Sequence, residues 1–241
     1  MVSLLLSAAS NPPLIFSGVK LPKLQPLGES RTLLRFPPTA ASAATPAVKG
    51  SLGLRTQLHR RPNLPSVKVQ EFNVYEIDEE DRDSPAYLRL MFNKVNSLGD
   101  IVSFTNKLYS GDMQTRLGIT NGICFVITHD DKTNGDRFEA VFSFYFGDYG
   151  QVSVQGPYLT YENSYLAVTG GSGIFKGVTG KVKVEPLALS PSKRFYTFWL
   201  KGIPDLPAPL RCTALPPFST VEPSPAAVAC QPGSALQNFT D

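Results

Sequence analysis

The 241-residue sequence has only three cysteines and two histidines, and it contains no long hydrophobic run. The cysteines are widely spaced, so they indicate neither a disulfide framework nor a zinc motif. His129 is the single histidine in the aromatic-rich part of the chain, which leaves no Ser-His-Asp or Cys-His nucleophile system to assemble there. No apolar run reaches the roughly 20 residues of a membrane span. We therefore expect no transmembrane segment, no metal and no hydrolase of the common types.

Acidic residues are almost missing from the first 65 residues. Residues 1–65 hold eight of the 23 Lys and Arg, nine of the 21 prolines and a single acid, Glu29. An Arg-containing, Ser/Ala/Pro-rich and acid-poor start is typical of an organelle transit peptide, which we predict to be disordered. A secretory signal and a disordered basic arm are the alternatives. The rest of the chain is mildly acidic, with 15 basic and 19 acidic residues, which argues against a nucleic-acid partner.

Proline is also unevenly distributed, and its distribution predicts the domain organisation. Residues 66–202 hold only four prolines but 21 of the 25 aromatic residues, which indicates one dense core. Residues 203–241 hold eight prolines and few large apolar side chains, which favours an extended arm packed on that core.

Helical periodicity is almost absent from residues 66–202. Apolar and polar residues alternate instead, between turn signals at short spacing, as in an antiparallel barrel or sandwich. Roughly eight strands in this length fit a small closed all-β barrel, wide enough for packed side chains or one slender ligand. The predicted strand segments are Val67 to Ile77, Tyr87 to Met91, Ile101 to Tyr109, Gly122 to Thr128, Arg137 to Phe146, Gln151 to Leu159, Ser164 to Thr169, Gly180 to Leu189 and Arg194 to Leu200.

The glycine cluster from Gly171 to Gly177 superficially resembles a phosphate-binding loop. Its spacing does not match a dinucleotide fingerprint, no helical pattern follows it, and no downstream Lys-Ser/Thr marks a P-loop. We interpret it as hairpin or bulge chemistry, as we do the Asn134-Gly135 turn signal.

Glu76 and Cys124 are the polar residues whose surroundings suggest burial. Glu76 shares a strand face with Val74, and an inward-facing carboxylate requires hydrogen bonds or a raised pKa. Periodicity alone favours the alternative, in which Glu76 begins the acidic surface run that follows it. Cys124 lies in an apolar run, where a thiol is usually a small buried hydrophobe.

Long blocks of the sequence closely resemble the plant allene oxide cyclase family, and the match extends from about Lys68 to Asp241. The blocks are Val74–Glu79, Asp81–Pro85, Leu98–Asp100, Phe104–Tyr109, Arg116–Thr120, Gly135–Ala140, Phe142–Gly150, Val154–Glu162 and Thr169–Phe175.

This resemblance implies an eight-stranded antiparallel β-barrel similar to a lipocalin, assembled as a homotrimer and imported into the chloroplast. The implied reaction is the stereoselective cyclisation of the 12,13-epoxy allene oxide of linolenic acid to cis-(+)-12-oxophytodienoic acid, a jasmonate precursor. The implied partners are this unsaturated C18 epoxide and, through functional coupling, allene oxide synthase. No cofactor is implied.

The resemblance also assigns roles to residues of this sequence. The catalytic glutamate of the family corresponds to Glu76, and the groups that hold a site water correspond to Asp78, Ser84, Pro85 and Asn106. The substrate-binding wall corresponds to Val102, Phe104, Cys124, Phe138 and Tyr158.

One assigned position departs from the family pattern, because Asp78 stands where an Asn is usual. A carboxylate accepts hydrogen bonds but does not donate them as an amide does. Two other functions remain open for such a barrel. One is a non-catalytic plastid lipid carrier, and the other is a dirigent-like protein, which a secretory signal would distinguish.

Overall fold

The computed structural model describes residues 68–90 and 96–239. The predicted transit peptide, residues 1–65, lies outside the described residues. The described part contains nine strands and very little helix. The strands are β1 (Gln70–Ile77), β2 (Ala86–Leu88), β3 (Ile101–Ser110), β4 (Arg116–Asp130), β5 (Gly135–Tyr145), β6 (Gln151–Leu159), β7 (Ser164–Gly171), β8 (Thr179–Leu189) and β9 (Ser192–Lys201).

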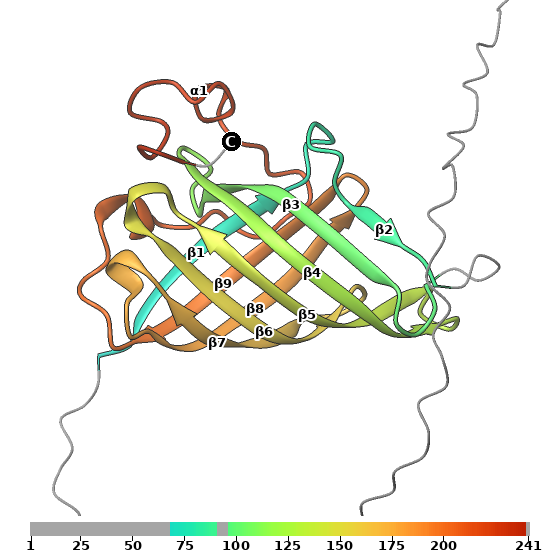
Figure 1. Cartoon of the computed structure of the whole chain (residues 1–241). Coiled ribbons are helices and arrows are strands. Elements are labelled where there is room, and N and C mark those ends of the chain that lie inside the picture. The colour runs from blue at the N-terminus through green and yellow to red at the C-terminus, as the bar shows by residue number, and fades with distance from the viewer. Residues whose placement is uncertain (1–67, 91–95, 240–241) are drawn as a thin grey trace, which may run out of the picture. The chain divides into compact units, whose positions relative to one another are not determined.

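Eight of the nine strands close into an antiparallel barrel (Figure 1). From β3 to β9 each strand pairs with the next one in the chain. β1 closes the barrel because it pairs with β9 along its whole length and with β3 over Val74–Ile77. β2 pairs only with β3 and lies outside the barrel. The predicted all-β class and the eight-stranded antiparallel barrel are thus confirmed.

Two predicted strand segments were wrong in extent. The segment Gly122 to Thr128 belongs to the much longer β4, Arg116–Asp130, whose first five residues are also buried. Of the segment Tyr87 to Met91, the described residues end at Leu90, and among them only Tyr87 and Leu88 belong to a strand, the three-residue β2, whose residues are all exposed and which is not a barrel strand. A strand that pairs with one neighbour and buries no side chains gains little stability from each added residue, so it stays short. The apolar–polar alternation of the sequence does not show how many neighbours a strand has.

One end of the barrel is filled by aromatic side chains. Phe72 of β1 and Phe198 of β9 are register partners, and their rings stack with centroids 4.4 Å apart. The rings of Phe144 and Phe146 pack edge-on against that of Phe198 at 4.8 and 6.4 Å. Inward-facing residues alternate along each strand, so Glu76 and Arg194 lie four residues from this packed end. The ring packing therefore leaves room only toward the other end.

Two turns pack so closely against each other that each needs a glycine at the point of contact. Gly150 ends a 3-10 turn, Gly147–Tyr149, and a Cβ there would lie 2.3 Å from the backbone oxygen of Ser172. Gly173 begins a second 3-10 turn, Gly173–Phe175, and a Cβ there would lie 2.3 Å from the oxygen of Tyr149. The glycine cluster is thus a close backbone contact between turns, and no long helix follows it.

The proline-rich segment after β9 packs against the barrel and contains two short helical turns, Ala208–Leu210 and α1 (Pro225–Val228). The Tyr75 hydroxyl donates hydrogen bonds to the oxygens of Leu215 and Pro216 at 3.0 and 3.1 Å. Lys193 of β9 donates to the oxygens of Ser219 and Val221 and to the Glu222 carboxylate, at 2.6 to 2.9 Å. No helix in residues 68–90 and 96–239 is long and apolar enough to cross a membrane.

Candidate functional site

A cavity of about 610 Å³ lies inside the barrel, toward the Glu76–Arg194 end of the β1–β9 pair. This volume is within the range of pockets that bury a ligand of drug or lipid size. Nine of the ten site residues assigned by resemblance line this one cavity. They are Asp78, Ser84, Pro85, Val102, Phe104, Asn106, Cys124, Phe138 and Tyr158.

The tenth residue, Glu76, is completely buried behind the cavity wall. Its Oε1 accepts hydrogen bonds from Asn106 Nδ2 and, at 2.7 Å, from Arg194 Nη1. Its Oε2 accepts one from the Tyr196 hydroxyl at 2.6 Å. All three donors line the cavity, so the carboxylate is connected to it through their side chains. The interpretation of Glu76 as the start of a solvated surface run was wrong, because these partners make its burial tolerable.

Arg194 and Tyr196 were not predicted as site residues. Both face inward from β9, and Arg194 pairs directly with Glu76 across β1 and β9. Burial by itself lowers the pKa of Arg194, but the neighbouring Tyr158 and Glu76 outweigh that effect and hold its pKa well above the usual value. Burial and the charge of Glu76 raise the pKa of Tyr196 well above its usual value, so this phenol stays protonated and donates. The sequence signal that could have identified Arg194 is its position in a strand rich in aromatic residues, where a charged side chain is unusual.

Asn106 connects Glu76 to the loop after β1. Its Oδ1 accepts a hydrogen bond from the Ser84 hydroxyl at 3.2 Å, and Ser84 Oγ in turn accepts the backbone N–H of Thr105 at 3.0 Å. Asn106 lies on β3, next to the strand pair that closes the barrel. The closing strands, β1 and β3, and the loop therefore hold this amide in a fixed orientation.

Asp78 follows β1 directly and is 6% exposed. Its Oδ1 accepts the backbone N–H of Glu80 at 3.0 Å, which fixes the turn, and the residue lines the cavity. The position that departs from the family pattern is therefore part of the cavity wall.

The rest of the cavity wall is mainly aromatic and apolar. The rings of Phe138 and Tyr158 stack with centroids 6.0 Å apart, and Phe104 and Phe142 meet edge-on at 5.4 Å. Burial raises the pKa of the Cys124 thiol to about 12, so the sulfur is neutral and presents a polarisable surface. Phe142 is a further wall residue that sequence reasoning missed.

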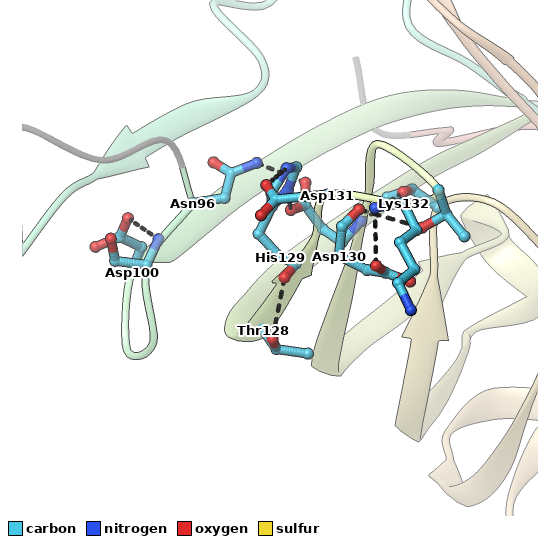
Figure 2. A network of polar contacts seen from close by, with 11 residues as sticks. Asn96, Asp100, Thr128, His129, Asp130, Asp131 and Lys132 are labelled. Atoms are coloured by element: carbon cyan, nitrogen blue, oxygen red, sulfur yellow. Dashed lines mark hydrogen bonds and ion pairs between the residues drawn. The ribbon is translucent and has the colours of Figure 1, made fainter.

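A polar cluster lies at the rim of the cavity, on the β4–β5 hairpin. Asp136 lines the cavity, accepts a hydrogen bond from Asn96 Nδ2 and contacts His129 Nδ1 at 2.7 Å. Figure 2 shows His129 and Asn96 in this cluster together with Asp131, whose carboxylate lies 3.6 Å from His129 Nε2. The hydrogen bond with Asp136 is the main cause of a raised pKa of His129.

Fold and site together define a class of protein, an antiparallel β-barrel with an internal cavity that is lined by aromatic rings and connected to a buried, hydrogen-bonded acid. Residues 65–239 match the family model described as allene oxide cyclase. The chain belongs to the allene oxide cyclase family, and it is an isomerase.

Solved structures with similar barrels include the pterocarpan synthase dirigent protein PsPTS1, at 17% identity and a TM-score of 0.45 over 57% of this chain and 97% of that chain. A pyocyanin demethylase is 18% identical, with a TM-score of 0.42 over 56% and 100% of the two chains. The Diels Alderase AbmU from Streptomyces koyangensis is 14% identical, with a TM-score of 0.44 over 58% and 71%. Similarities this low have no bearing on the activity of this chain.

Proposed function

We propose that this cavity binds the 12,13-epoxy allene oxide of linolenic acid and cyclises it to cis-(+)-12-oxophytodienoic acid in jasmonate biosynthesis. One observation carries the proposal. Nine of the assigned residues line one cavity although they come from five separate segments of the chain, the β1–β2 loop and strands β3 to β6, and the three donors that hold Glu76 line the same cavity. Membership of the allene oxide cyclase family supports the reaction class.

The main contribution of the protein is steric. Opening of the epoxide gives an oxyallyl-type cation with an enolate oxygen, and ring closure then needs the two ends of the pentadienyl system to meet on one face. The stacked rings of Phe138 and Tyr158 and the edge-on pair of Phe104 and Phe142 form a rigid wall against which the flexible chain folds. Holding the folded conformer removes orientational entropy from the reaction step and selects one enantiomer.

Polar groups complement this wall. Asp78, Ser84, Pro85 and Asn106 line the cavity and can together hold a bound water, which can donate a hydrogen bond to the oxygen on which negative charge develops. The neutral Cys124 sulfur and the ring faces favour the delocalised cation through their polarisability.

The direct test adds the purified protein to a system that generates the allene oxide from the 13-hydroperoxide of linolenic acid. Chiral chromatography should then find a large excess of the cis-(+) product over the racemate that forms spontaneously. Product that stays racemic at all protein concentrations would remove the cyclase assignment and favour a lipid carrier.

We also propose that the protein is a homotrimer. Phe125, Ile127 and Val141 are 37% to 40% exposed, and they lie on the outer face of the paired strands β4 and β5. Apolar side chains gathered on one face are typical of an interface between copies. Light scattering should give three times the monomer mass for the native protein and a smaller mass for Phe125→Glu. A monomeric native protein would contradict this assembly.

Chloroplast import and coupling to allene oxide synthase complete the proposal. A fusion of residues 1–65 to a fluorescent protein should accumulate in chloroplasts, and secretion of the fusion would contradict the proposed location. If the two enzymes are coupled, the protein should co-purify with the synthase. Alternatively, the excess of the cis-(+) enantiomer should be higher when both enzymes are immobilised together. Equal product excess with mixed and separated enzymes, and no co-purification, would contradict the coupling.

A further inference from the structure

One guanidinium group connects two residues of the cavity network that belong to different strands. Arg194 Nη1 donates to Glu76 Oε1 at 2.7 Å, and Arg194 Nε donates to the Tyr158 hydroxyl oxygen at 2.8 Å. Glu76 lies on β1 and Tyr158 on β6. The planar arginine fork has fixed N–H directions, so the bond to Glu76 determines where the second N–H points. Arg194 thereby fixes the position of the Tyr158 oxygen.

Three hydroxyl groups in this network differ in the acceptor to which they donate a hydrogen bond. Tyr196 donates its proton to Glu76, and Ser84 donates its proton to Asn106. In the described part of the chain, the partner of the Tyr158 hydroxyl is Arg194 Nε, which is itself the donor. The phenolic proton of Tyr158 is therefore left to point into the cavity that this residue lines.

We infer that the Tyr158 O–H is the direct hydrogen-bond donor to the allene oxide oxygen while its C–O bond opens, and that Arg194 is the residue that positions it. This inference rests on the proposed function. As negative charge develops on the oxygen, the bond from Tyr158 becomes charge-assisted and strengthens. The N–H that Tyr158 accepts from a cation polarises its own O–H and makes it a better donor. The proton stays on Tyr158 throughout.

The same geometry gives Glu76 a defined part in the reaction. Its two oxygens already accept three hydrogen bonds, and its charge is paired with that of Arg194. It does not line the cavity, so it acts on the reacting atoms through Arg194 and Tyr158. Glu76 therefore holds Arg194 in place, and Arg194 in turn positions the Tyr158 hydroxyl.

Tyr158→Phe tests the inference because it removes only the hydroxyl and keeps the ring that stacks on Phe138. We expect kcat in the coupled assay to fall by about 10- to 100-fold with little change in KM. The matched control is Tyr165→Phe, since Tyr165 lies on the exposed face of β7 with the Lys181 ammonium 5.3 Å from its ring centroid. The control should keep wild-type kcat.

A double-mutant cycle tests the role of Arg194. Arg194→Lys keeps the charge but lacks the two-pronged fork, so we expect a lower kcat in the wild-type background. If Arg194 acts through the Tyr158 hydroxyl, adding Arg194→Lys to Tyr158→Phe should lower kcat by less than about twofold more. Circular dichroism of each variant shows whether the barrel is intact, and Tyr158→Phe alone still decides the donor if Arg194→Lys does not fold.

The possible outcomes separate this inference from the proposed function. Wild-type kcat in a folded Tyr158→Phe protein, with the product still enantiomerically enriched, would overturn the inference and leave the cyclase assignment in place. Fully multiplicative effects of the two substitutions would overturn the positioning role of Arg194. Racemic product from the wild-type protein would instead overturn the proposed function itself.

Discussion

Glu76 and Arg194 face each other across β1 and β9 as direct register partners, and their side chains form an ion pair of 2.7 Å inside the barrel. Glu76 is fully buried, so neither water nor salt weakens this pair strongly. A buried pair loses stability when one partner is removed, because the other charge is then left without compensation. This relationship decides what substitutions at either position should do.

Glu76→Leu should destabilise the barrel, because it leaves the Arg194 guanidinium in the wall without its counter-charge. The expected loss in the free energy of unfolding is about 3 to 5 kcal/mol. Urea unfolding followed by tryptophan fluorescence measures it. The double variant Glu76→Leu with Arg194→Met serves as the comparison, since it removes both charges and should regain a large part of the loss. A single variant as stable as the wild type would show that the pair contributes nothing to stability.

The fold and the assigned residues were largely accessible from the sequence, whereas the network around them was not. Alternation along Val74 and Glu76 placed both residues on one face, and the resemblance placed nine of the assigned residues on the wall of what proved to be a single cavity. Arg194 was missed because its partner Glu76 is 118 residues away. Periodicity within one strand carries no information on the register between β1 and β9.

The position of the cavity could not be predicted for a related reason. Whether an inward aromatic residue fills the barrel or lines a hollow depends on which rings meet across strands. Phe72 stacks on Phe198 and closes one end, while Phe138 stacks on Tyr158 and lines the cavity. The residue type is the same at both ends, and only the packing of neighbouring strands distinguishes them.

Asp78→Asn should raise the rate of cis-(+) product formation at neutral pH by about two- to fivefold, a change of less than about 1 kcal/mol for one altered hydrogen bond. The asparagine oxygen can still accept the Glu80 backbone N–H, and the new amide can donate toward the cavity. Initial rates in the coupled assay measure the effect. Asp83→Asn, an exposed acid outside the cavity lining, is the control and should leave the rate unchanged. A slower Asp78→Asn enzyme would contradict this role.

The His129–Asp136 contact at the cavity rim should make stability depend on pH. The hydrogen bond with Asp136 is the largest cause of a raised pKa of His129; burial opposes it, and the charges of Asp136, Asp131 and Asp130 add to the rise. A raised pKa in the folded state means that the stabilisation is fully present below the unfolded value of about 6.5 and is lost as pH rises through the folded value.

Thermal unfolding of the wild type and of His129→Gln between pH 5.5 and pH 9 checks this dependence. The difference between their melting temperatures should be largest near pH 5.5 and should shrink as the pH rises. His59→Gln, at the other histidine of the chain, is the control and should show no such trend. A difference that grows toward pH 9 would contradict the sign of the effect.

Lys193→Met should loosen the proline-rich segment from the barrel. The Lys193 side chain is only 4% exposed, and its ammonium satisfies two backbone oxygens and the Glu222 carboxylate. Leaving those acceptors without a donor should cost about 2 to 4 kcal/mol in the free energy of unfolding. Urea unfolding and limited proteolysis within residues 212–224 measure the change. Lys183→Met, which removes a more exposed ion pair with Glu185, should cost less than about 1 kcal/mol.

Chiral analysis of the product formed by a cavity-blocking variant tests most directly the claim that cyclisation takes place inside the barrel. Val102→Phe adds a ring to the inner wall, and Val69→Phe adds the same ring at an exposed position outside the cavity lining. Both variants should stay folded by circular dichroism. The account predicts near-racemic product from Val102→Phe and a wild-type excess of the cis-(+) enantiomer from Val69→Phe. A wild-type excess from a folded Val102→Phe protein would contradict it.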